Sequence, residues 1–104
     1  MTFGQVVSEA RKEMGMSQRE LALKVLKEDG SSISPQYLND IERDRRNPPG
    51  EHLLEQFARE LHLDIDYLYF LSGKLPSELR SMTSSPQRVK QAFRAFRRTL
   101  GGGR

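Results

Sequence analysis

The sequence predicts an all-α fold, a five-helix domain followed by a C-terminal amphipathic helical extension. One observation is that apolar residues recur at spacings of three and four along most of the chain, as on the inner faces of helices. A second is that capping residues precede these apolar runs, at Thr2, Ser17, Ser34, Asp64 and Ser85. A third is that glycines follow several of the runs, where helices commonly end.

Length and composition limit the class of protein. A chain of 104 residues with 36% hydrophobic residues can form one small domain with one modest core and an appendage. The sequence has no cysteine, which excludes disulfides and thiolate metal sites and fits a reducing compartment. No apolar run approaches the length of a membrane span or of a signal-peptide core. We therefore expect a cytoplasmic protein with no membrane partner.

The charge is distributed unevenly. Residues 1–80 hold 11 Lys and Arg against 14 Asp and Glu, a net charge of −3. Residues 81–104 hold 6 Lys and Arg and no acid, a net charge of +6. The overall charge therefore gives no argument that the first part binds nucleic acid. That argument depends on the local cluster of basic residues between Arg19 and Arg46.

The first helix is predicted over residues 2–14. Thr2 and Gln5 form a capping box at its start, and Gly15 ends it. Arg11 lies at the edge of the inner stripe, where its stem can cover apolar surface while its head stays in water. The stripe itself consists of Phe3, Val6, Val7, Ala10 and Met14.

The stretch from Ser17 to Asn47, SQRELALKVLKEDGSSISPQYLNDIERDRRN, predicts two capped helices joined by a turn. Ser17 and Glu20 form a second capping box. Ser34 and Pro35 start the next helix with an N-cap hydroxyl and a proline at the first helical position. Its inner face has Leu38 and Ile41, and its outer face carries Gln36, Asn39, Asp40 and Arg43.

This pair of helices suits double-stranded DNA, because the second helix can enter the major groove while arginines at its exit hold phosphates. Gln18 and Gln36 are the best base-reading candidates, since a glutamine amide can pair bidentately with adenine. Asp40 can accept from a cytosine amine but repels phosphate, and Asn39 is a weaker candidate. The other candidate DNA contacts are Arg19, Ser34, Tyr37, Arg43, Arg45, Arg46 and Asn47. The alternative is the ordinary polar face of a surface helix.

The residues SQRELA, ISPQYLNDIER and RRNP resemble the Cro/C1-type helix-turn-helix family, the lambda-repressor-like DNA-binding domains. The resemblance spans residues 2–73 and implies a five-helix DNA-binding domain. It also implies a base or backbone contact at Gln18 and base contacts at Gln36 and Asp40. Finally, it implies a partly buried ion pair between Arg11 and Glu42, against the alternative of a solvated Arg11.

Two features depart from the family's pattern. The segment 26–33 is longer than the family's short turn, and we expect its residues LKEDG to extend the second helix, with Gly30 as a left-handed stop and Ile33 in the core. This insertion puts the usual angle between the two helices in doubt. It also brings Lys24 and Lys27 near the DNA backbone, with Glu28 and Asp29 opposing them. The second departure is Asp44, where many relatives have a left-handed glycine.

Two further helices complete the domain. The fourth, after the turn at residues 47–51, has the inner stripe Leu53, Leu54, Phe57, Ala58 and Leu61. The fifth runs from Asp64 to Gly73, with Ile65, Leu68 and Leu71 inward. Its aromatic residues Tyr67, Tyr69 and Phe70 exceed what one inner face needs. They predict either core and edge packing or a dimer contact, since relatives often pair through this region.

The remaining chain divides into a polar connector, 74–85, with one turn at residues 77–80, and a basic helix with a flexible tail, 86–104. The helix has an apolar seam formed by Val89, Ala92, Phe93, Phe96 and Leu100, surrounded by basic residues. The seam can bury against its own domain, a second subunit or another protein. We predict that it packs on a five-helix domain, its own or a partner's, and enlarges a homodimer.

No pattern for a catalytic, cofactor or metal site stands out. His52 and His62 lack the spacing of paired ligands, and no nucleophile triad or phosphate loop is present. The sequence predicts a non-enzymatic repressor that binds a palindromic operator as a homodimer. The alternative is an antitoxin-like or protease-controlled subunit whose tail binds a partner protein. The segment LSGKLPSELR is similar to repressors that a dedicated protease controls.

Overall fold

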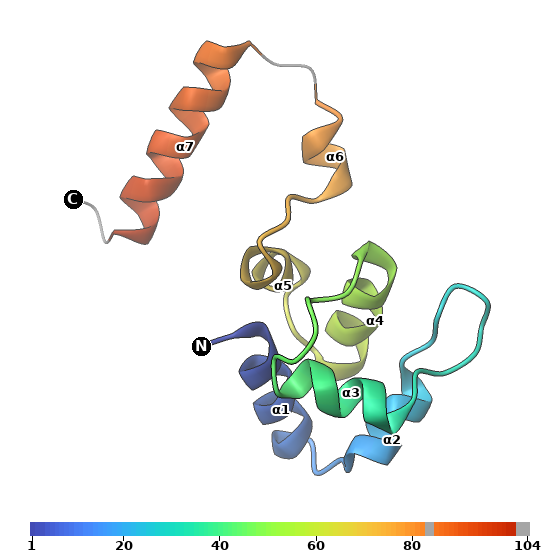
Figure 1. Ribbon diagram of the computed structural model, residues 1–104. Helices are drawn as coiled ribbons and strands as arrows, with labels where there is room; N and C mark the ends of the chain where they lie inside the picture. The colour runs from blue at the N-terminus through green and yellow to red at the C-terminus, as the bar shows by residue number, and fades with distance from the viewer. Residues whose placement is uncertain (83–84, 102–104) are drawn as a thin grey trace.

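The computed structural model describes residues 1–82 and 85–101, and these residues form seven helices (Figure 1). The helices are α1 Phe3–Glu13, α2 Gln18–Lys24, α3 Pro35–Glu42, α4 Glu51–Leu61, α5 Ile65–Ser72, α6 Ser77–Arg80 and α7 Pro86–Leu100. The first five gather into one body, α6 leads away from it, and α7 forms an outer arm (Figure 1). The predicted all-α class with a C-terminal helical extension is confirmed.

The predicted caps begin the helices. Thr2 and Ser17 each form a full capping box, with side-chain and backbone bonds in both directions. The Ser34 hydroxyl accepts from the Tyr37 N–H at 3.0 Å. At the start of α4 no side chain caps the helix, and Gly50 occupies the N-cap position. These bonds satisfy N–H groups that a helix leaves without partners in its first turn.

One apolar core holds the five-helix body together. Its fully buried members include Leu21, Leu38, Ile41, Leu54, Phe57 and Leu68 from four helices. The rings of Phe3 and Phe57 meet edge to face with centroids 6.3 Å apart, which joins α1 to α4. The prediction that Met14 belongs to this core is wrong. It lies at the C-cap of α1 and is 42% exposed, because the helix ends one residue earlier.

The start of α1 lies against the end of α3. A Cβ added to Gly4 would lie 2.4 Å from the Ile41 carbonyl oxygen, so only glycine permits this approach. Asp44 has the left-handed conformation that the sequence predicts, with φ of 57°. Its carboxylate accepts from the Gly4 N–H at 3.0 Å and from the Thr2 hydroxyl at 2.5 Å. An aspartate at this position therefore adds a second cap to α1, which a glycine would lack.

The expected extension of α2 is wrong. The helix ends at Lys24, and residues 26–32 form a short hairpin closed by an antiparallel bridge between Leu26 and Ser32. Within it the Lys27 N–H donates to the Ser31 carbonyl at 2.7 Å, and Gly30 takes a φ of 87° in the tip rather than ending a helix. Ile33 is buried in the core, as predicted.

Two side chains of α4 hold the base of this hairpin. Gln56, itself buried, accepts from the Leu26 N–H at 3.2 Å. The His52 ring nitrogen Nε2 lies 3.0 Å from the Leu26 carbonyl oxygen. Both backbone groups of Leu26 thus bond across to α4, and this explains why the chain leaves the helix here.

The C-terminal helices expose apolar surface. Tyr69 is buried in the core, which is the packing alternative that the sequence left open, whereas Tyr67 and Phe70 are exposed. The seam residues of α7 that are large and apolar, Val89, Phe93, Phe96 and Leu100, are 44% to 61% exposed. One ring contact, between Phe70 and Phe96 at 6.1 Å, joins α7 to α5.

No helix among the described residues is long and apolar enough to cross a bilayer.

Candidate nucleic-acid interface

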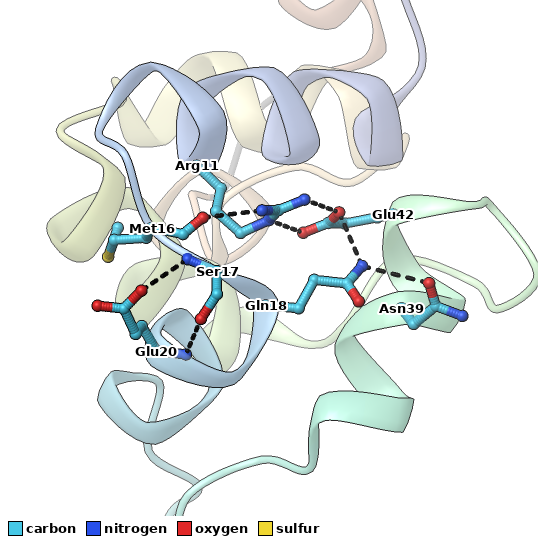
Figure 2. A network of polar contacts seen from close by, with 7 residues as sticks. All are labelled: Arg11, Met16, Ser17, Gln18, Glu20, Asn39 and Glu42. Carbon is cyan, nitrogen blue, oxygen red and sulfur yellow. Dashed lines mark hydrogen bonds and ion pairs between the residues drawn. The ribbon is translucent and has the colours of Figure 1, made fainter.

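Arg11 and Glu42 form a buried ion pair next to Gln18, one of the predicted DNA contacts (Figure 2). Arg11 of α1 donates from Nε to Glu42 Oε2 at 2.7 Å and from its second terminal nitrogen to Glu42 Oε1 at 2.9 Å. It also donates to the Met16 carbonyl at 2.8 Å. The two side chains are only 10% and 4% exposed. This geometry is the bidentate arrangement that gives a charged pair its strongest hydrogen bonds.

The pair shifts both ionisation equilibria. The hydrogen bond with Glu42 raises the pKa of Arg11 above its ordinary value, although burial opposes it. Burial alone would raise the pKa of Glu42, but hydrogen bonds from Arg11 and Gln18 outweigh it and leave that pKa below its ordinary value. Both groups are therefore charged at neutral pH.

Gln18 connects this pair to the outer face of α3. Its amide nitrogen donates to Glu42 Oε1 at 3.0 Å and to Asn39 Oδ1 at 3.2 Å (Figure 2). The network Arg11–Glu42–Gln18–Asn39 thus joins α1, α2 and α3. The two helices of the motif are therefore joined by side-chain hydrogen bonds that do not depend on the long connection between them.

The exposed face of α3 has a second set of contacts. The Gln36 amide donates to Asp40 Oδ1 at 3.1 Å, and Arg46 Nε lies 3.8 Å from Asp40 Oδ2. The Arg46 guanidinium also stacks over the Tyr37 ring, 5.0 Å from its centroid. These contacts orient Gln36 and Asp40 side by side on the solvent side of the helix.

The other predicted contacts surround this face. Arg19, Ser34, Arg43, Arg45 and Asn47 are exposed, on α2, at the start of α3 and after its end. The Ser34 hydroxyl already accepts from the Tyr37 N–H but keeps its own proton to donate. Sequence reasoning missed Lys12, which lines a polar groove of about 250 Å³ with Gln18, Asn39 and Arg43. Its place in the last turn of α1, directly after Arg11, was the available signal.

The arrangement offers hydrogen-bonding groups for recognition. Amides and a carboxylate occupy the middle of the exposed surface of α3, and cations flank it, which matches base edges between phosphates. Among the described residues, no group of three or more His, Asp or Glu side chains is placed to hold a metal ion.

Comparisons with known proteins identify similar chains. A family model described as helix-turn-helix matches residues 7–68. The solved structure of SinR, the master regulator for biofilm formation, in complex with DNA is 31% identical over 64% of this chain and 97% of that chain, with a TM-score of 0.55. The N-terminal DNA-binding domain of SinR from Bacillus subtilis is 32% identical over 64% and 87%, with a TM-score of 0.53.

A third solved structure covers more of the chain. A chain from the complex of the SinR and SinI proteins matches over 94% of this chain and 99% of that chain, with a TM-score of 0.56. Its identity is 24%, so it shows similarity of fold alone. Comparison with curated protein sequences gives no significant match.

Proposed function

The chain belongs to the helix-turn-helix family, in its Cro/C1-type branch, and from this premise we propose that it is a sequence-specific DNA-binding regulator of transcription. It acts as a repressor in the cytoplasm, by occupying a palindromic operator as a homodimer, and performs no chemistry. Residues 1–73 bind DNA, residues 74–85 link this domain to the C-terminal helix, and residues 86–104 contribute to dimer formation. Similarity to SinR, which has been solved with DNA, supports the first of these roles.

The exposed face of α3 is the observation that carries this proposal. Gln36 is exposed there and donates to the neighbouring Asp40, which is partly buried, and Arg43, Arg45 and Arg46 follow at the helix end. A helix with amides at its centre and cations at its rim can contact base edges and phosphates together. Gln18 and Asn39, joined by a hydrogen bond, extend the same surface onto α2.

The exposed aromatic and apolar residues of α5 and α7 are evidence for the proposed homodimer. Tyr67 and Phe70 on α5 and the α7 seam of Val89, Phe93, Phe96 and Leu100 leave apolar surface in solvent. Surface of this kind marks interaction sites. We propose that it is covered in the homodimer, because a palindromic operator requires two copies of α3 about one DNA turn apart.

A second candidate function uses the same helix. The basic face around the α7 seam fits a partner protein with an acidic helix, as in an antitoxin-like subunit. The fold is shared over 94% of this chain with one that has been solved in a protein complex, SinR with SinI. Co-purification of a partner that requires residues 86–100 would favour this role, which can coexist with DNA binding.

Selection of bound duplexes from a random DNA pool tests the main proposal. We expect enrichment of one two-fold symmetric sequence with half-sites about one helical turn apart. The Arg45→Ala, Arg46→Ala double variant should bind every duplex more weakly, because it loses phosphate contacts that carry no sequence information. Failure of the wild-type chain to enrich any sequence would overturn the proposal.

A further inference from the structure

We propose that the hairpin, residues 26–32, is a second DNA-contacting element and that Lys27 binds a backbone phosphate beside the recognition helix. This inference rests on the proposed DNA-binding function. It concerns the insertion that distinguishes the chain from the short turn of its family, and it assigns the insertion a role in binding.

An open cleft of about 900 Å³ lies between the hairpin, α2 and α3. Three cations from three separate segments line it, Arg19 of α2, Lys27 of the hairpin and Arg46 after α3. Ser34 and Tyr37, two of the predicted DNA contacts, line it as well. Among the described residues that form its walls, none is acidic. The rest of the lining is mostly apolar, from residues such as Ala22, Ile33 and Leu53. The three cations give the cleft a positive potential that favours a nearby phosphate.

The acidic residues of the hairpin do not line the cleft. Glu28 and Asp29 line a second hollow of about 420 Å³ on the side of α4, together with Glu51 and His52, and Lys27 lies between the two hollows and lines both. Asp29 is also occupied, since its carboxylate accepts from the Ser31 N–H at 2.9 Å and from the Ser31 hydroxyl at 2.6 Å. Lys27 therefore lies near these acids, as the sequence suggests, but the cleft that it shares with Arg19 and Arg46 has no acidic residue in its lining among the described residues.

The hairpin is also anchored well enough to position a cation. Its ladder bond from Lys27 N–H to Ser31 carbonyl, at 2.7 Å, orients the residue whose side chain lines the cleft. Gln56 and His52 hold the preceding residue, Leu26, to α4. A fixed backbone lowers the entropy that Lys27 would lose on binding. Leu23 of α2, exposed beside it, offers an apolar contact to a deoxyribose.

The salt dependence of binding tests this role. The full chain should be titrated onto its selected duplex over a range of salt concentrations, as wild type, Lys27→Ala and Lys24→Ala. One lost phosphate contact changes the slope of log affinity against log salt by about 0.9, so Lys27→Ala should reduce the slope by roughly 1.8 for a dimer. Lys24→Ala is the matched control, since the sequence suggests that both lysines lie near the DNA backbone but only Lys27 lines the cleft. It should leave the slope close to wild type.

Two further results would decide the inference. Glu28→Gln should leave affinity nearly unchanged, because Glu28 does not line the cleft, whereas a marked gain would place Glu28 beside the phosphates and contradict the role given to the cleft. An unchanged slope in Lys27→Ala, or an equal loss in Lys24→Ala, would overturn the role of the hairpin while the wild-type chain still bound its operator. Loss of wild-type binding altogether would instead overturn the proposed function.

Discussion

Gln36 and Asp40 show how single residues prepare the DNA-facing surface. Gln36 donates to Asp40 and would have to exchange this bond for one to a base, which lowers the net gain of the base contact. Asp40 also lies 3.8 Å from Arg46, so part of its charge is balanced within the chain. The repulsion between Asp40 and phosphate that the sequence suggests is therefore weakened by a neighbour six positions away.

The buried ion pair leads to a stability prediction. Arg11→Ala leaves the Glu42 carboxylate buried without its partner, which should lower the free energy of unfolding by about 3–5 kcal/mol. Lys12→Ala is the matched control, because it removes an exposed charge from the adjacent position and should cost within about 0.5 kcal/mol. Urea denaturation of the three proteins measures the difference. Equal stability of the two variants would contradict a structural role for the pair.

The same pair predicts the direction of the pH dependence. The pKa of Glu42 is lower in the folded chain than in the unfolded chain, so the unfolded state takes up the proton first. The stabilisation is fully present above the unfolded pKa of about 4.3 and is lost as pH falls through the folded pKa. Glu42→Gln should remove this part of the acid dependence, and a variant with an unchanged acid limb would show that Glu42 does not carry it.

At the scale of elements, the capped helices could be predicted and the hairpin could not. Thr2, Ser17 and Asp64 cap helices through bonds within three residues, so a short window of sequence contains all the information. The segment LKEDG contains good helix formers, but Leu26 gives its backbone bonds to His52 and Gln56 in a different helix. Such distant partners leave no local pattern, and tertiary contacts override propensity here.

The candidate DNA-binding site also has a part that the sequence predicts and a part that it does not. The outer face of α3 follows from helical spacing, which is why Gln36 and Asp40 were expected on one surface. The contacts that orient it, the hydrogen bond from Gln18 to Asn39 and the ion pair of Arg46 with Asp40, come from residues outside α3, which helical spacing does not place. The ion pair of Arg11 with Glu42 was expected from family resemblance, because spacing alone left a solvated Arg11 open.

The tail helix α7 leads to a prediction of its own. A lone amphipathic helix of this length is marginal in water, and among the described residues one ring contact, of Phe96 with Phe70, joins α7 to the five-helix body. A chain ending at Ser81 should therefore dimerise less and bind its operator more weakly. Sedimentation equilibrium and operator titration measure the two effects.

A matched variant separates the seam from its charges. The Phe93→Ala, Phe96→Ala chain keeps every arginine of α7 and should dimerise as poorly as the truncated chain if the apolar seam makes the contact. Dimerisation of the truncated chain at wild-type affinity would assign α7 to another partner, and the protein-interaction role would then be favoured.

At the scale of the whole molecule, charge and shape both distinguish the five-helix body from the basic helix α7. Residues 1–80 have a net charge of −3, so DNA binding by the body depends on a local cationic surface rather than on its total charge. The principal extents of 46 × 31 × 23 Å describe an elongated molecule, with α7 as an arm beside the body (Figure 1). An exposed basic arm can contact flanking DNA or an acidic face of a second copy.

The most direct test of the central claim, that the exposed face of α3 reads bases, is a double-mutant cycle between Gln36 and the operator. Affinities would be measured for wild type and Gln36→Ala on the selected duplex and on duplexes with single base-pair changes. At the base pair that Gln36 contacts, wild type should lose about 1–3 kcal/mol on the change while Gln36→Ala loses almost nothing more. If Gln36→Ala discriminates every base pair as wild type does, α3 does not read bases through Gln36 and the account is contradicted.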